Sequence, residues 1–161
     1  MNYECRIATL EEVNEQFNYN IEINEDKDQW IEWKNQFISM IKDNIMIPYY
    51  GFLGDTCISE AHAIISKHND FVLIKHDRPY LHAFRTRTEY QGQHYFTKLF
   101  NFMIDDLKAR GYTKFSVGVE STETKNKEIY THYGFTKYLF SNTETYKDGS
   151  IHIIEYYEKT L

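Results

Sequence analysis

The loop at residues 89–94 (EYQGQH) has the clearest chemical potential in the chain, because it stands between an expected strand and a long expected helix. The first N–H groups of a helix have no intrahelical partner, and the helix dipole adds positive potential there. Gly92 lets a ligand approach the backbone, so the loop is a candidate cradle for an anion such as a pyrophosphate. From this segment alone, an ordinary turn in which Gly92 only relieves strain is better supported, since one glycine is a weak signal.

Several other chemistries are absent from the sequence. It contains no Gly-x-x-x-x-Gly-Lys, Gly-x-Gly-x-x-Gly or Gly-x-Ser-x-Gly motif. The seven histidines are scattered, and none forms the i, i+4 pair that helical metal sites use. The two cysteines, Cys5 and Cys57, lie far apart in expected strands. We expect buried free thiols in a reducing cytoplasm rather than a disulfide, and we expect no metal.

The net charge of the chain limits the classes of partner that it is expected to bind. It is −6, from 24 acidic against 18 basic residues. Phosphate binding needs a basic footprint, so nucleic acid is not an expected partner, whereas a cationic substrate suits an acidic chain. No apolar run approaches the length of a membrane span, and no leader is visible after Met1. We therefore expect a cytoplasmic protein with no membrane contact.

Positioning this loop requires a fold, and 161 residues suffice for one domain, residues 1–161, with one core. Thr9 and Glu12 have the spacing of a capping box, which predicts a helix start, and residues 14–28 are interpreted as a helix end plus a loop. Periodicity predicts further helices at residues 28–42, 96–110 and 126–133. Strand candidates lie at residues 3–8, 49–53, 56–65, 71–75, 80–86, 114–119, 138–145 and 151–157.

The expected order is strand, two helices, three strands, helix, strand, helix and two strands. This order indicates an α+β domain with one twisted, mainly antiparallel sheet flanked by helices. The 14 tyrosines and 11 phenylalanines are unusually many. Because tyrosine has an apolar body and a polar tip, we expect many of them at the margin of the core or along a cleft.

Two further sequence features follow the loop at residues 89–94. A strand ends in the Val-rich run 117–119 (VGV), and the next helix closes in Tyr130-x-x-x-Gly134-Phe135. Together with the glycine-containing loop, these features resemble the GNAT superfamily of acetyl-CoA-dependent N-acetyltransferases. The resemblance covers residues 80–138 closely, and the remaining elements fit the family's order.

The loop departs from the family pattern, which is Gln/Arg-x-x-Gly-x-Gly/Ala. Only Gly92 conforms, since Glu89 and His94 occupy the other two positions. The imidazole of His94 stands where a small residue normally lets the phosphates approach. Glu123 replaces an asparagine that often starts the later helix, and Asn126 lies one turn on.

The resemblance implies that acetyl-CoA is the co-substrate and that an amine attacks its thioester directly. Main-chain groups near Phe84 and Thr86 would hold the pantetheine arm like an added strand, and an N–H there would polarise the thioester carbonyl. The remaining residues implied to bind the cofactor are Gln91, Gly92, Gln93, His94, Tyr95, Phe96, Thr97 and Asn126.

Two proton transfers accompany this reaction, because the amine loses a proton and the departing thiolate gains one. Tyr130 occupies the position that family members often use for the acid. Glu60 and His82, on strands expected to border the cleft, and Glu120, after the Val-rich strand, are candidates for the base. Water relays are an alternative to a dedicated base, and a structural role is the alternative for each of these side chains.

The acceptor is expected to be a small-molecule amine, and its identity stays open between a small amine, a polyamine, an aminoglycoside-like compound and a peptide N-terminus. The acidic loop at residues 22–26 could attract a cationic amine, or it is an ordinary solvated loop. Two other functions compete: a non-catalytic module that binds CoA or acyl-CoA, and an α+β domain without a CoA site. A homodimer is compatible with all of these functions.

Overall fold

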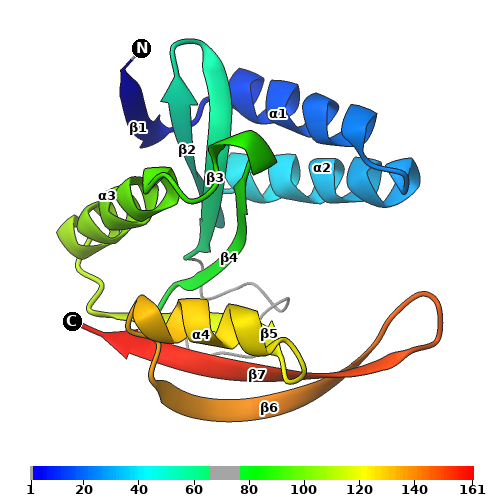
Figure 1. Ribbon diagram of the computed structural model, residues 1–161, viewed down its shortest axis with the longest axis vertical. Helices are drawn as coiled ribbons and strands as arrows, with labels where there is room; N and C mark the ends of the chain where they lie inside the picture. The colour runs from blue at the N-terminus through cyan, green and yellow to red at the C-terminus, as the bar shows by residue number, and fades with distance from the viewer. Residues whose placement is uncertain (1, 66–76) are drawn as a thin grey trace.

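One seven-stranded sheet organises the part of the chain that the structure, a computed structural model, describes: residues 2–65 and 77–161 (Figure 1). The strand order across it is β1-β2-β3-β4-β5-β7-β6. The strands are β1 (Tyr3–Ile7), β2 (Met46–Leu53), β3 (Thr56–Ile64), β4 (Tyr80–Thr86), β5 (Lys114–Glu120), β6 (Lys137–Thr145) and β7 (Ile151–Thr160). The helices are α1 (Leu10–Ile23), α2 (Lys27–Lys42), the 3₁₀ turn η1 (Thr88–Tyr90), α3 (Tyr95–Ala109) and α4 (Thr124–His132).

The order of these elements confirms the predicted α+β fold. Every pair of neighbouring strands is antiparallel except β4 with β5, which are parallel. The strand candidate at residues 71–75 lies outside the described residues.

Residues 14–28 contain a helix end and a loop, as predicted: α1 continues to Ile23, and α2 begins at Lys27. The start of α1 is as predicted: the Thr9 hydroxyl accepts from the Glu12 N–H at 3.1 Å, and the Glu12 carboxylate accepts from the Thr9 N–H at 3.0 Å. The buried face of α1 then includes two polar residues, Gln16 and Asn20. They hid the amphipathic stripe from the sequence because their burial depends on a distant hydrogen-bond partner.

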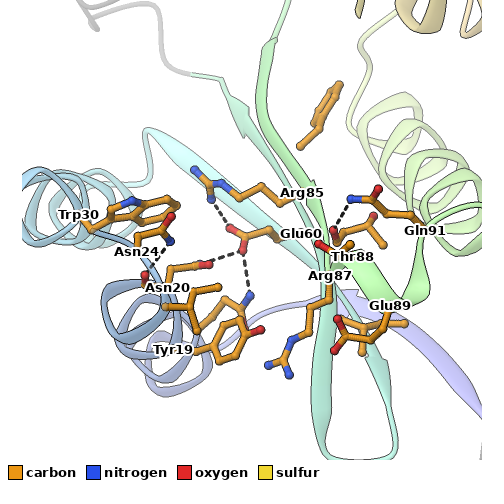
Figure 2. A pocket seen from close by; sticks show the side chains of 15 residues that line it. Tyr19, Asn20, Asn24, Trp30, Glu60, Arg85, Arg87, Thr88, Glu89 and Gln91 are labelled. Atoms are coloured by element: carbon orange, nitrogen blue, oxygen red, sulfur yellow. Dashed lines mark hydrogen bonds and ion pairs between the residues drawn. The ribbon is translucent and has the colours of Figure 1, made fainter. Parts of the chain in front are cut away.

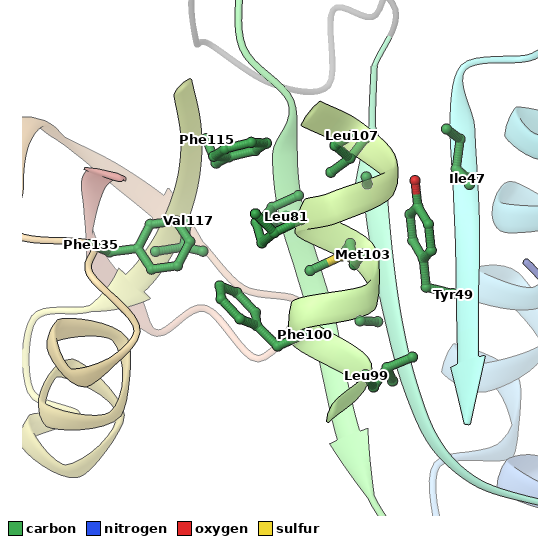
Figure 3. Close-up of a cluster of buried hydrophobic side chains, with 13 residues drawn as sticks. Ile47, Tyr49, Leu81, Leu99, Phe100, Met103, Leu107, Phe115, Val117 and Phe135 are labelled. Carbon is green, nitrogen blue, oxygen red and sulfur yellow. The ribbon is translucent and has the colours of Figure 1, made fainter. Parts of the chain in front are cut away.

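Both faces of the sheet are covered. In β2, Tyr49 and Tyr50 are neighbours that point to opposite faces, and both are 0% exposed. The Tyr50 face packs against α1 and α2 in a cluster that includes Phe17 and Phe37. The Tyr49 face packs against α3, as Figure 3 shows for the cluster of Ile47, Tyr49, Leu81, Leu99, Phe100, Met103, Leu107, Phe115, Val117 and Phe135. Two-sided burial explains why the central strands read as apolar runs rather than as strict alternation.

The sheet opens between β4 and β5. The two strands pair only at Tyr80 and Ser116, where the Ser116 N–H donates to the Pro79 carbonyl at 3.0 Å. Beyond this point their ladder ends. The β3–β4 register shifts opposite this region, and Ala83 adopts a φ of 54°, which is strained for a residue with a Cβ. The bulge bends β4 away from β5 and leaves its β5-facing edge without a strand partner.

A substitution of Leu99, on α3, tests whether this helix packs into the core. Leu99 is 0% exposed, so Leu99→Ala should lower the free energy of unfolding by about 2–5 kcal/mol through lost burial and a residual cavity. The matched change Leu10→Ala, at a leucine that is 39% exposed, should cost less than about 1 kcal/mol. Denaturant unfolding measures both losses, and equal losses would contradict the placement of Leu99 in the core.

Candidate active site

A cleft of about 740 Å³ lies between the end of β4 and helix α4. Its walls come from the end of β4, from Gln91, from the first turn of α3 and from the whole length of α4. Of the residues predicted to bind a cofactor, Phe84, Thr86, Gln91, Phe96 and Asn126 line this cleft. An adjoining hollow of about 250 Å³ is lined by the loop and the start of α3, including Gly92, His94, Tyr95 and Thr97. Gln93 lines neither; its side-chain amide donates to the Glu89 carbonyl at 3.1 Å.

The loop before α3 exposes a row of backbone donors. The first intrahelical hydrogen bond of α3 runs from the Lys98 N–H to the His94 carbonyl. The N–H groups of residues 92–97 have no acceptor within the part of the chain that the structure describes. Gly92 has a φ of 74°, and a Cβ at this position would meet nothing within 4 Å. These donors and the helix dipole are features that suit an anion, so the loop remains a candidate cradle.

His94 caps this helix in the left-handed conformation, with a φ of 66°. Its side chain is exposed and makes no capping hydrogen bond. A left-handed residue is normally glycine, which explains why a small residue is usual at this position. The departure from the family pattern therefore leaves the loop shape intact, at the expense of local strain.

Tyr130 connects the cleft to a second cavity. It lines the cleft beside α4 and also a cavity of about 660 Å³ at the opening between β4 and β5. Its ring packs edge-on against Phe84, with ring centroids 5.9 Å apart. The hydroxyl has no hydrogen-bond partner among the described residues, and burial raises the pKa of the phenol, so it stays protonated. It is available to donate a proton.

The second cavity, called here the acidic cavity, lies on the face of the sheet opposite α4. Ile154 and Tyr156 of β7 line it, whereas Glu155 between them pairs with Lys127 of α4 on the other face. Its lining contains three glutamates and no lysine or arginine. The lining residues are Tyr80, His82, Gly118, Val119, Glu120, Glu123, Tyr130, Glu144, Thr145, Tyr146, Ile154 and Tyr156.

His82 lies in the wall of the acidic cavity. It stacks on Tyr80, with ring centroids 5.6 Å apart, and contacts Phe37 and His62 edge-on or tilted. Its Nε2 is buried and has no partner among the described residues. Burial lowers the pKa of His82 well below its ordinary value and that of His62 to about 3. Both rings are therefore neutral near pH 7.

Glu60 lies in a third cavity of about 400 Å³, between α1, α2 and the end of β4 (Figure 2). Its side chain is 1% exposed. The carboxylate accepts from Gln16 at 2.9 Å, from Asn20 at 3.2 Å and from Arg85 at 2.6 Å. The Arg85 guanidinium in turn lies over the Trp30 ring, 4.7 Å from its centroid. The structure thus brings His82 and Tyr130 to one cavity and places Glu60 in another, where its oxygens are already occupied.

Sequence reasoning missed most of the acidic cavity. Glu120 was a candidate, and it lines the cavity while pairing with His152. Glu123, Glu144 and Tyr156 were not proposed as site residues, although the alternation of the last hairpin could have placed Tyr156 on the inner face. They come from separate elements that only the fold brings together.

The acidic loop at residues 22–26 has other contacts. The Asp26 carboxylate caps α2 by accepting from the Gln29 N–H at 3.1 Å. The Lys27 ammonium donates to the carbonyls of Ile21 and Glu22 at the end of α1. The acidic side chains of this loop line none of the cavities described above.

Three general features complete the description. Among the described residues, no group of three or more His, Cys, Asp or Glu side chains could hold a metal ion. No described helix combines the length and the apolar character that a membrane span requires. The two cysteines are free thiols; Cys57 is buried, whereas Cys5 is only partly buried, unlike the expectation.

Comparisons with known proteins find the same fold and one matching family. A family model for the acetyltransferase (GNAT) family matches residues 7–135. The structure resembles an N-acetyltransferase from Staphylococcus aureus Mu50, with 16% identity, a TM-score of 0.71 and 99% of each chain covered. It also resembles the ribosomal-protein-S18-alanine N-acetyltransferase from Escherichia coli, with 14% identity, a TM-score of 0.71, and coverage of 99% of this chain and 94% of the other.

A third similar structure is a PaiA N-acetyltransferase from Thermoplasma acidophilum, solved in complex with coenzyme A. It shares 16% identity, with a TM-score of 0.64 and 100% of both chains covered. At these identities the structural similarities establish the fold alone. A search of curated protein sequences finds no match.

The left-handed cap predicts a difference between two substitutions of His94. His94→Gly should be more stable than His94→Ala by about 1 kcal/mol, because only glycine adopts this φ without a Cβ penalty. Denaturant unfolding of the two variants measures the difference, and equal stabilities would contradict the conformation. Affinity for CoA then reports on the imidazole: tighter binding in both variants indicates obstruction, and weaker binding in both indicates a phosphate contact.

The two buried histidines predict a loss of stability on mild acidification. His62 and His82 are neutral in the fold, whereas in the unfolded chain they titrate near about pH 6.5. Below that pH the unfolded chain binds more protons, so the free energy of unfolding falls by up to about 1.4 kcal/mol per pH unit for each histidine. Between about pH 6.5 and pH 5 most carboxylates stay ionised, so the histidines should dominate the slope.

Urea unfolding across this pH range measures the slope. His62→Phe keeps an aromatic ring against Phe37 and Tyr50 but removes one titrating group. Its slope should be shallower than that of the unmodified protein. A variant with the same slope would show that His62 does not contribute.

Proposed function

Because the chain belongs to the acetyltransferase (GNAT) family of acetyl-CoA-dependent enzymes, we propose that it acetylates a primary amine of a small, cationic molecule by direct attack on the thioester. The observation that carries this proposal is the position of Tyr130, which lines both the cleft beside α4 and the acidic cavity. A proton donor in the wall between the cleft and the acidic cavity can act on a reaction between a molecule in the cleft and a molecule in the cavity.

The residues of the cleft suit coenzyme A. The free N–H groups of residues 92–97 would hold its pyrophosphate. The unpaired edge of β4 near Phe84 and Thr86 would bind the pantetheine arm through main-chain hydrogen bonds. When bound, acetyl-CoA supplies the activated acetyl group, and a backbone N–H beside the strained Ala83 is suited to polarise its carbonyl.

The acidic cavity would hold the acceptor. Its three glutamates would attract a protonated amine, which becomes a nucleophile only after losing a proton. In the transfer, the amine nitrogen bonds to the acetyl carbon and the carbon–sulfur bond breaks. Before the attack, the ammonium loses one proton to solvent through a water relay, because burial disfavours a proton on the His82 ring. Tyr130 donates its proton to the departing sulfur, and the second proton of the attacking nitrogen restores the phenol.

We assign Glu60 a positioning role instead of that of the base. Its carboxylate fixes Arg85 on β4 and ties Gln16 and Asn20 of α1 to the sheet. This network holds α1 against the strand that carries the bulge. Removing one partner from such a buried ionic network would leave the others unsatisfied.

We also propose a cellular compartment and an oligomeric state for the protein. Free thiols at Cys5 and Cys57 support a reducing compartment, and we propose the cytoplasm. Exposed apolar side chains on β7, Ile151 at 70% and Ile153 at 51% exposed, support a homodimer through the outer hairpin.

Tyr130→Phe tests the proposed acid. The variant should bind acetyl-CoA as the unmodified protein does, because the ring and its packing on Phe84 remain. It should lose turnover on the order of 100-fold, as expected when a general acid is removed. Thermal-shift titration measures binding, and release of free CoA measures turnover.

Tyr138→Phe is the matched control, since Tyr138 is 53% exposed and lines none of the described cavities. It should retain full activity. Unchanged turnover in Tyr130→Phe would remove Tyr130 from the mechanism. No thermal shift with acetyl-CoA in the unmodified protein would overturn the proposed function itself.

A further inference from the structure

We propose that the acidic cavity selects a linear diamine or polyamine as the acceptor, holding one amine beside Tyr130 and His82 and a second ammonium at Glu144. This inference rests on the proposed function and narrows its substrate class. Three independent features of the cavity support it: its charge, its aromatic walls and the unpartnered groups at its two ends.

The charge of the cavity exceeds what one ammonium requires. Glu120 is paired with His152, and Glu123 accepts from the neutral Asn126 amide at 2.6 Å. Glu144 has no hydrogen-bond or ion-pair partner among the described residues. The carboxylates of Glu123 and Glu144 therefore have no cationic partner, and the lining of the cavity contains no lysine or arginine. An acceptor with a second positive charge would compensate them.

The walls suit a methylene chain. The rings of Tyr80 and Tyr156 lie side by side with centroids 6.1 Å apart, and Ile154 adjoins them. Phe140 stacks on Tyr156 from behind, at 4.7 Å, and fixes its orientation. Aromatic faces bind both alkyl surface and cationic groups. Burial and then the charge of Glu144 raise the pKa of Tyr156, which places the Glu144 carboxylate near this wall.

The two ends of the cavity differ. At the inner end, the hydroxyl of Tyr130 has no partner among the described residues, as an amine about to react would require, and the ring of His82 forms part of the wall. At the outer end, Glu144 stands on the exposed hairpin β6–β7. Lys147 near the tip of this hairpin donates to Glu32 of α2 at 2.7 Å, which links the hairpin to the rest of the domain. A flexible chain between two ammonium groups fits this arrangement.

An acceptor with a carboxylate does not suit the cavity. It would bring a negative charge among three glutamates, with no basic side chain in the lining to receive it. After acetylation, the inner nitrogen is a neutral amide, so the product carries one positive charge fewer than the substrate. Its attraction to the cavity is weaker, which favours release.

The test compares hexylamine with hexamethylenediamine, which carries a second primary amine on the terminal carbon of the same six-carbon chain. With acetyl-CoA, kcat/KM should be higher for the diamine, after correction for its two reactive amines, by on the order of tenfold. Glu144→Gln should remove most of this preference, because kcat/KM should fall much further for the diamine than for hexylamine. Glu15→Gln, an exposed change of equal charge on α1 outside the cavities, should preserve the preference.

Calorimetric titration of both amines into the CoA complex separates this inference from the proposed function. Diamine binding that depends on Glu144, without acetyl transfer, would support the inference and refute the function. Equal acetylation of both amines, or an equal effect of Glu144→Gln on both, would overturn the inference and leave the function standing. Binding of neither amine would overturn the inference as well.

Discussion

The divergence of β4 from β5 is the constraint on which the rest of the structure depends. Two parallel strands in the middle of a sheet normally pair along their length, and here the ladder holds at Tyr80 and Ser116 alone. The near end is fixed by the Pro79–Ser116 hydrogen bonds and by a buried ion pair between Arg78 and Glu158. The strained backbone at Ala83 turns β4 aside. Unpaired backbone results inside the sheet, where an extended ligand could bind.

Opening the sheet also joins its two faces. The cleft beside α4 and the acidic cavity lie on opposite faces and share Tyr130 as a wall. Rigid packing holds this residue in place, because Phe84 and Phe135 contact its ring edge-on. The Tyr130 phenol can therefore contact an acetyl donor on one face of the sheet and an amine acceptor on the other. The separation would also keep an anionic cofactor apart from the three glutamates of the acidic cavity, which would otherwise repel it.

The sequence predicted the features that rest on local patterns. Helical and strand periodicity gave the element order, and the Tyr130-x-x-x-Gly134-Phe135 spacing led to the family. Features that depend on distant contacts were not predictable in the same way. The burial of Gln16 and Asn20 was not predictable because their partner, Glu60, lies on β3. The acidic cavity combines side chains of β4, β5, β6, β7 and α4, so no segment of the sequence carries its signature.

A crystal structure of the protein with bound coenzyme A tests the central claim most directly, namely that transfer takes place in the opening between β4 and β5. The account predicts the pyrophosphate on the N–H groups of residues 92–97, the pantetheine arm along the β4 edge, and the sulfur within hydrogen-bonding distance of the Tyr130 hydroxyl. A pyrophosphate bound elsewhere, or a sulfur remote from both Tyr130 and the acidic cavity, would contradict it.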